Sequence, residues 1–150
     1  MKNTSFSSLY RQYRTAPLGS GRKYEIYKQM IKTARSFNDW AIIHRYGDNS
    51  YQYLALEQMK AKVLKGKTSS DVQKNILVLF DLVTDEDEQN GILKAFLSKY
   101  DSRDDLLFAW DLSPCLVMEF SDMSFSEFKK AISEKEKHLQ KMRNNSEFLN

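Results

Sequence analysis

Residues 33–59 read TARSFNDWAIIHRYGDNSYQYLALEQM and predict a helix, a tight turn and a second helix. Ser36 is placed to cap the first helix, and Asp39 three residues later completes a capping box. The apolar side chains that follow at helical spacing are Phe37, Trp40, Ile43 and, one position off, His44. Gly47 is expected to end this helix in the left-handed conformation that glycine adopts at little cost.

The second helix of this hairpin has its own start signal. Asp48, Asn49 and Ser50 supply the next N-cap. The apolar stripe that follows consists of Tyr53, Leu56 and Met59. Residues 33–59 therefore predict a helical hairpin, and the rest of the chain repeats the pattern.

Cap residues mark the repeats. First helices are expected to begin at Ser5, Ser36, Ser70 and Ser102, which are 31, 34 and 32 residues apart. Second helices are expected to begin at Ser20, Ser50, Thr84 and Ser113, at spacings of 30, 34 and 29 residues. Periods of this length are typical of two-helix units that stack side by side.

Two stretches also echo each other in sequence. Residues 37–40 resemble residues 6–9, and residues 53–59 resemble residues 24–30. Over residues 5–121 the chain resembles the α-solenoid class, the helical-hairpin repeats of the tetratricopeptide and HEAT kind. The Gly-Tyr pair, crossing alanines and closing proline of the tetratricopeptide pattern do not recur. The resemblance therefore implies an architecture and no binding residues.

We predict an all-α fold of about four antiparallel helical hairpins, stacked as a short right-handed solenoid or an irregular bundle, plus a C-terminal amphipathic helix. A single domain, 1–150, is expected from the chain length. The expected parts are units near 5–35, 36–67, 69–100 and 102–121, a helix at 124–142 and a frayed tail at 143–150. The apolar run 76–83 could form a buried strand, but a cap at Ser70 favours a helix packed on two sides.

Composition limits the class of protein. Hydrophobic residues make up 41% of the 150 residues, which is enough for a core. The single cysteine, Cys115, excludes an internal disulfide and is expected to be a buried, inert thiol. No signal peptide or apolar run long enough for a bilayer is visible. We therefore expect a soluble, cytoplasmic protein without membrane contact, or one delivered by a route that leaves no mark in the sequence.

The net charge of +3 hides a partition along the chain. Residues 1–67 carry 13 Lys or Arg and four acids, whereas residues 68–127 carry four Lys or Arg and 13 acids. Residues 128–150 are basic again, with six Lys or Arg and three acids. Such separated charge steers partners more than it stabilises a fold, and it would permit head-to-tail self-association.

Signals for enzyme chemistry are few. Of the two histidines, His44 lies near an apolar face, which favours a partly buried structural role, and His138 lies in a Lys/Glu-rich helix. Residues 85–91 resemble a calcium loop only in composition, because the glycine falls at the seventh position and Phe96 stands where a glutamate ligand is needed. We therefore predict no enzyme, no cofactor and no metal site.

The basic N-terminal part is also rich in aromatic side chains. Seven of the eight tyrosines lie in residues 10–53, among eight Arg or Lys. Protein interfaces concentrate Tyr and Arg, and single-stranded nucleic acid is bound by similar surfaces. A plain structural interpretation, in which the tyrosines edge the core and the lysines are solvated, remains open.

These patterns favour a non-enzymatic protein–protein interaction module of adaptor, inhibitor, immunity or effector type, with a charge-polarised helical surface. The alternative is nucleic-acid binding through the basic, Tyr-rich N-terminal half. The candidate contacts on the basic side are Arg11, Tyr13, Arg14, Lys28, Arg45 and Tyr46. The candidate contacts on the acidic side are Asp85, Glu86, Asp87, Asp104 and Asp105.

Overall fold

A computed structural model describes residues 4–120 and, beyond them, residues 130, 133–134, 137 and 140–142. The chain forms two compact units, unit 1 (Met1–Thr84) and unit 2 (Asp85–Asn150). All regular structure in the described residues is helical, so the predicted all-α class is confirmed there. The boundary between the units divides the expected repeat unit 69–100.

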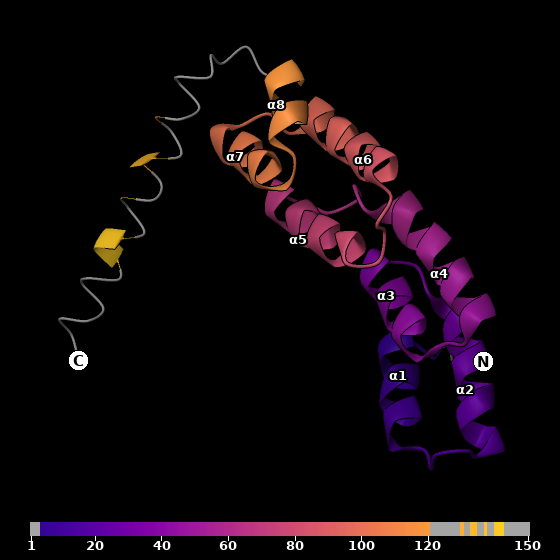
Figure 1. Cartoon of the computed structure of the whole chain (residues 1–150). Helices are drawn as coiled ribbons and strands as arrows, with labels where there is room; N and C mark the ends of the chain where they lie inside the picture. The colour runs from indigo at the N-terminus through magenta and orange to yellow at the C-terminus, as the bar shows by residue number, and fades with distance from the viewer. Residues whose placement is uncertain (1–3, 121–129, 131–132, 135–136, 138–139, 143–150) are drawn as a thin grey trace. The chain divides into compact units, whose positions relative to one another are not determined.

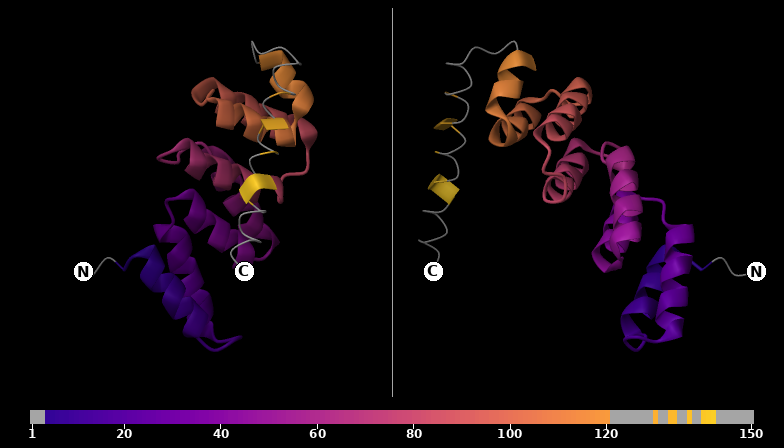
Figure 2. Two further views of the ribbon diagram at one scale, coloured as in Figure 1. Left: turned by 90° about the vertical axis from the view of Figure 1, so that its left-hand side faces the viewer. Right: turned by 45° about the vertical axis from the view of Figure 1, so that its right-hand side comes forward.

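Unit 1 contains five helices among its described residues: α1 (Phe6–Thr15), α2 (Gly21–Thr33), α3 (Phe37–Tyr46), α4 (Asn49–Lys62) and α5 (Ser69–Phe80). Helix α1 lies beside α2, and α3 lies beside α4, as Figures 1 and 2 show from several sides. Helix α2 also contacts α3. Successive helices therefore pack in pairs, as the hairpin pattern predicts.

The first two hairpins bury equivalent positions of their echoing sequences. Met30 of α2 and Met59 of α4 are both fully buried, and Ile26 and Ala55 four residues earlier are buried as well. The first helix of each pair likewise buries apolar side chains, Phe6 and Leu9 in α1 and Phe37, Trp40 and Ile43 in α3. In both hairpins the buried residues therefore lie on one face of each helix and at equivalent sequence positions.

Most helix starts were predicted correctly because caps are local interactions. Ser36 Oγ accepts a hydrogen bond from the Asp39 amide, and the Asp39 side chain accepts one from the Ser36 amide. Ser102 and Asp105 form the same box at the start of α7, and Ser5 and Ser20 cap α1 and α2. A side-chain oxygen at each start satisfies an amide that lacks a partner within the helix.

Two predicted starts were wrong by one or two residues. The cap of α5 is Thr68 in place of Ser70, and the cap of α6 is Asp85 in place of Thr84. Helix α4 is capped by Asp48, one of the three neighbouring residues predicted to supply its N-cap. Each true cap lies beside another residue able to cap a helix, so local chemistry did not distinguish them.

Gly47 ends α3, but not in the predicted left-handed conformation. Its backbone is extended, with φ −89° and ψ 163°. The reason for glycine here is space, because a Cβ atom at this position would collide with the hydroxyl of Tyr27 and lie 3.0 Å from the Ile43 carbonyl oxygen. The left-handed glycine of this region is Gly19, with φ 73°, in the turn between α1 and α2.

The apolar run 76–83 is helical as far as Phe80, so the strand alternative is excluded. Val72, Ile76 and Leu79 form its buried stripe. Leu77 and Val78 on the same helix are exposed, which contradicts packing on two sides. The helix buries one stripe at a spacing of three to four residues, as an amphipathic surface helix does.

Unit 2 contains α6 (Glu86–Lys99), α7 (Arg103–Leu112) and α8 (Pro114–Phe120), which all contact one another. The ring of Phe96, fully buried, meets the ring of Phe108 edge-on at a centroid distance of 5.7 Å. Cys115 is exposed in the first turn of α8, so its predicted burial was wrong. The next two residues, Leu116 and Val117, are buried.

The predicted helix at 124–142 and tail at 143–150 lie for the most part outside the described residues. Glu134, which is described, accepts a hydrogen bond from the Arg103 guanidinium at 2.7 Å. This contact holds the pKa of the Glu134 carboxyl below its usual range. None of the described helices combines the length and apolar character that crossing a bilayer requires.

Candidate functional site

Five tyrosines of unit 1 form a continuous group of touching rings, which we call the tyrosine cluster. Its members are Tyr10 and Tyr13 of α1, Tyr27 of α2, Tyr46 of α3 and Tyr51 of α4. Successive ring centroids lie 5.3–5.9 Å apart, and most of the rings meet at steep angles. Tilted and edge-on pairs at these distances are favourable beyond the area they bury.

Tyr27 contacts the rings of Tyr13 and Tyr51 and is the buried member of the cluster, with 4% of its surface exposed. Its hydroxyl donates a hydrogen bond of 2.9 Å to the carbonyl oxygen of Ile43. Burial, reinforced by the neighbouring tyrosines and Asp48, raises the pKa of Tyr27 far above its usual value. The hydroxyl therefore stays protonated and joins α2 to the last turn of α3.

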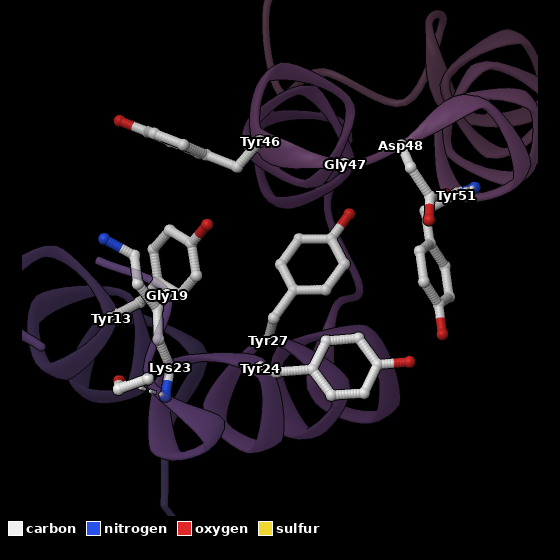
Figure 3. Close-up of a pocket in the computed structure, with 10 residues that line it drawn as sticks. Tyr13, Gly19, Lys23, Tyr24, Tyr27, Tyr46, Gly47, Asp48 and Tyr51 are labelled. Carbon is white, nitrogen blue, oxygen red and sulfur yellow. Dashed lines mark hydrogen bonds between the residues drawn. The ribbon is translucent and has the colours of Figure 1, made fainter. Parts of the chain in front are cut away.

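A small open pocket of about 280 Å³ lies against the cluster (Figure 3). Its lining residues are Tyr13, Gly19, Ser20, Lys23, Tyr24, Tyr27, Tyr46, Gly47, Asp48 and Tyr51. Pockets for drug-sized ligands and cofactors usually have volumes of about 300–1,000 Å³. This pocket is smaller, and its size fits a single amino-acid side chain better than a cofactor.

Cationic groups lie over three tyrosine rings at this surface. The Arg14 guanidinium carbon is 5.6 Å from the Tyr10 centroid, and Lys23 Nζ is 4.6 Å from the Tyr13 centroid. Lys28 Nζ lies 4.7 Å from the ring centroid of Tyr24, which is half exposed. Each distance lies within the range of cation–π attraction, so these side chains and rings hold one another in place.

At the outer edge of the cluster, two tyrosine hydroxyls form a hydrogen-bonded pair whose pKa values shift in opposite directions. The hydroxyl oxygens of Tyr10 and Tyr46 lie 3.1 Å apart. Hydrogen bonding between them raises the pKa of Tyr10 and lowers the pKa of Tyr46, and Arg45 lowers the latter further.

Five of the six basic-side residues predicted as contacts meet this surface. Tyr13 and Tyr46 belong to the cluster, and Arg14 and Lys28 lie over tyrosine rings. Arg45 lies close enough to Tyr46 for its charge to lower the pKa of that phenol. Arg11 is exposed on α1 and lies over no ring among the residues that the structure describes.

The five acidic candidates all lie in unit 2, at helix starts. Asp85 caps α6, Glu86 and Asp87 are exposed in its first turn, and Asp104 is exposed in the first turn of α7. Asp105 differs, because it is buried and its carboxylate accepts hydrogen bonds from the amide and hydroxyl of Ser102. Asp105 is therefore a capping residue and not an accessible contact.

His44 is half-buried on α3, and desolvation lowers the pKa of its imidazole. Its carbonyl oxygen accepts a hydrogen bond of 3.2 Å from Gln52 Nε2, which ties α3 to α4. Across the described residues, no three His, Cys, Asp or Glu side chains gather as a metal site would need.

Five aromatic or cationic residues of this surface were absent from the predicted contacts: Tyr10, Lys23, Tyr24, Tyr27 and Tyr51. Tyr24 and Tyr27 are three residues apart in sequence, a spacing that places both on one side of a helix. Only tertiary packing brings the Tyr27 ring against Tyr13 of α1 and Tyr51 of α4. A density of tyrosines in residues 10–53 was the signal available in the sequence.

Comparison with known protein families finds no matching family, and comparison with curated sequences and with solved structures finds no significant match. What the structure itself defines is an all-α chain whose successive helices pack in pairs. The tyrosine cluster and its neighbouring charges are therefore the features that bear on function.

Proposed function

We propose that this chain is a non-enzymatic protein-interaction module that binds an acidic partner through the tyrosine cluster. The carrying observation is a pocket of about 280 Å³ whose aromatic lining is flanked by cations. A pocket of this size would accept one anchoring side chain. Buried anchors of this kind, surrounded by Tyr and Arg, dominate the binding energy of protein interfaces.

The charge of unit 1 supports an acidic partner. Its residues 1–84 include 14 Lys or Arg and six Asp or Glu, for a formal net charge of +8. Unit 2, with nine Lys or Arg and 14 Asp or Glu, has a formal net charge of −5. Opposite charge accelerates association and selects orientation, so an acidic protein would meet unit 1 first.

The partner test compares wild type with two surface variants by affinity capture from the native cell and mass spectrometry. Tyr46→Ala removes an exposed ring of the cluster, and Arg14→Glu reverses a cation beside it. Tyr53→Ala and Arg22→Glu are matched controls, because both residues are exposed in unit 1 and lie outside the ring contacts. An acidic protein lost from the first two variants and retained by both controls supports the proposal.

One result would contradict the proposed binding surface. If all four variants capture the same proteins in the same amounts, the tyrosine cluster is not the binding surface. Circular dichroism of each variant confirms that a lost partner does not reflect an unfolded chain.

Self-association is a variant of this proposal, in which unit 1 of one copy meets unit 2 of another. The charges of +8 and −5 favour such a head-to-tail contact. It would weaken as salt screens the charges, so size-exclusion chromatography in low salt and in roughly 0.5 M salt tests it. A monomer of the same size in both buffers excludes it.

Nucleic-acid binding through unit 1 is the second candidate. The observation in its favour is that Arg14, Lys23 and Lys28 each lie over a tyrosine ring, the combination that single strands require. The rings of the cluster mostly contact one another, however, and offer few free faces for bases. This candidate predicts affinity for oligonucleotides that falls steeply with salt, and a flat salt response excludes it.

We also propose that the helix pairs form a short solenoid and that the protein acts in the cytoplasm. The equal burial of Met30 and Met59 in successive pairs supports repeated units. First-helix caps at Ser5, Ser36, Thr68 and Ser102 are 31, 32 and 34 residues apart. Small-angle scattering distinguishes an elongated solenoid from a round bundle, and cell fractionation tests the compartment.

A further inference from the structure

A second hollow in unit 1, with a volume of about 570 Å³, is lined by an unusual number of basic side chains. We call it the lysine hollow, and its cations are Arg35, Lys62, Lys65, Lys67 and Lys74. They come from the residues before α3, the last turn of α4, the loop after it, and α5. Among the described residues of the lining, Asp71 is the one acid.

These cations are only partly compensated, because Asp71 is the one acid in the described lining. Within the described part of the chain, none of the five forms an ion pair, although Lys28 and Lys60 elsewhere in unit 1 do. Like charges gathered around a hollow repel one another, and low-dielectric walls concentrate their field. An anion in the hollow would relieve that repulsion.

The loop that carries two of the lysines is held in place. The Lys65 amide donates a 3.0 Å hydrogen bond to the Lys62 carbonyl, and Asn75 Nδ2 donates one of 3.2 Å to the Val63 carbonyl. Gly66 packs so closely on α5 that an added Cβ atom would lie 2.9 Å from the Asp71 Cβ. A fixed loop presents its cations at a lower entropic cost on binding.

The start of α3 forms part of the wall of the hollow, where the Asp39 carboxylate accepts hydrogen bonds from the amides of Arg35 and Ser36. Ser36, Phe37 and Asn38 line it, and α3 is a helix of ten residues. The first amides of a helix have no intrahelical acceptor and form the positive end of its dipole. The cap formed by Ser36 and Asp39 uses the Asp39 amide but not those of Phe37 and Asn38.

Size and lining indicate the class of ligand. A volume of about 570 Å³ lies within the usual range for small-molecule sites, unlike the pocket at the tyrosine cluster. The one aromatic residue in the described lining, Phe37, is 7% exposed and offers little surface for stacking a base. We infer that the lysine hollow binds a compact anion bearing several phosphate groups.

Inorganic tripolyphosphate is the probe, titrated into the full chain by calorimetry at moderate salt. Wild type is expected to bind with a Kd of roughly 10–100 µM. Lys65→Gln/Lys67→Gln, on an exposed stretch of loop, is expected to weaken binding at least about tenfold, because two charge-assisted contacts are lost. Lys65→Arg/Lys67→Arg keeps the charge and is expected to restore most of the affinity.

Two further variants distinguish a site from general attraction. Arg11→Gln/Arg22→Gln removes the same charge from exposed positions on α1 and α2 and is expected to change the affinity less than about twofold. Asp71→Asn removes the acid of the hollow and is expected to tighten binding, a gain that damage to the fold would not produce. ATP and a short oligothymidylate serve as parallel probes.

The outcomes separate the possibilities. Failure of wild type to bind tripolyphosphate, or equal losses in both Gln pairs, overturns the inference. An oligothymidylate that binds more tightly than tripolyphosphate through the same two lysines assigns the hollow to nucleic acid instead. Because the variants at the hollow leave the tyrosine cluster intact, failure here does not affect the proposed protein contact.

Discussion

Substitution of Gly47 by alanine tests the packing on which the tyrosine cluster depends. The backbone at Gly47 is extended, a conformation open to alanine, so the substitution changes contacts and not backbone strain. The new Cβ atom would collide with the Tyr27 hydroxyl and would lie 3.0 Å from both the Ile43 carbonyl oxygen and the Tyr51 Cβ. Helix α2, the end of α3 and the start of α4 would all have to adjust.

The expected magnitude combines two opposing effects. Overpacking of a close contact costs about 1–3 kcal/mol. A Gly-to-Ala change stabilises by about 0.4–1 kcal/mol through the unfolded chain when the conformation is compatible. We therefore expect Gly47→Ala to lower the free energy of unfolding of unit 1 by about 1–2 kcal/mol.

A double-mutant cycle with Tyr27→Phe isolates the collision. Removing the Tyr27 hydroxyl loses its 2.9 Å hydrogen bond to Ile43, which costs about 1 kcal/mol. It also makes room for the alanine, so the double variant should be more stable than additivity predicts by at least about 1 kcal/mol. Urea unfolding followed by Trp40 fluorescence, in a Trp110→Phe background, reports on unit 1.

The control is Gly21→Ala in the first turn of α2, where an added Cβ atom meets nothing within 4 Å. This variant should be neutral or slightly more stable. If Gly47→Ala also proves neutral, or if the cycle with Tyr27→Phe is additive, the close approach of α2 to the α3–α4 turn is wrong.

Three further predictions concern other parts of the chain. Gly91→Ala, at an open site within α6, should stabilise unit 2 by about 0.5–1 kcal/mol in denaturant unfolding. Asp39→Ala removes half of a capping box and should destabilise unit 1 by about 1 kcal/mol, whereas Asn38→Ala beside it should have little effect. Burial lowers the pKa of His44, so the His44 imidazole binds a proton more readily in the unfolded state than in the folded state. The free energy of unfolding should therefore fall as the pH drops below about 6.5. His44→Gln should make the stability depend less steeply on pH in that range.

Local sequence was sufficient for most of the helix starts. The box Ser36–Asp39 forms as predicted, and Ser102 caps α7 as predicted, because a cap depends on atoms only three residues apart. Where two capping residues stand close together, as Thr68 and Ser70 do, the sequence did not decide between them. Gly66 lies against Val72 in the structure, a contact from outside the helix that constrains where α5 begins.

Exposure of individual residues was harder to predict. Cys115 precedes two apolar residues and was expected to be buried with them, yet it is exposed. Asp105 was expected at the surface, but it is buried and its carboxylate accepts a hydrogen bond from the Ser102 hydroxyl. Hydropathy is an average over a stretch, whereas burial depends on which face of the helix each side chain occupies.

The amino-acid sequence by itself determined the helical class, the hairpin periodicity and the division of charge, because all three follow from spacing and composition along the chain. Tertiary structure alone decided that Tyr10, Tyr27 and Tyr46, from three different helices, join in one cluster. It also decided that cations from four segments surround one hollow. Contacts between residues distant in sequence depend on how helices pair, and packing rather than local propensity sets that pairing.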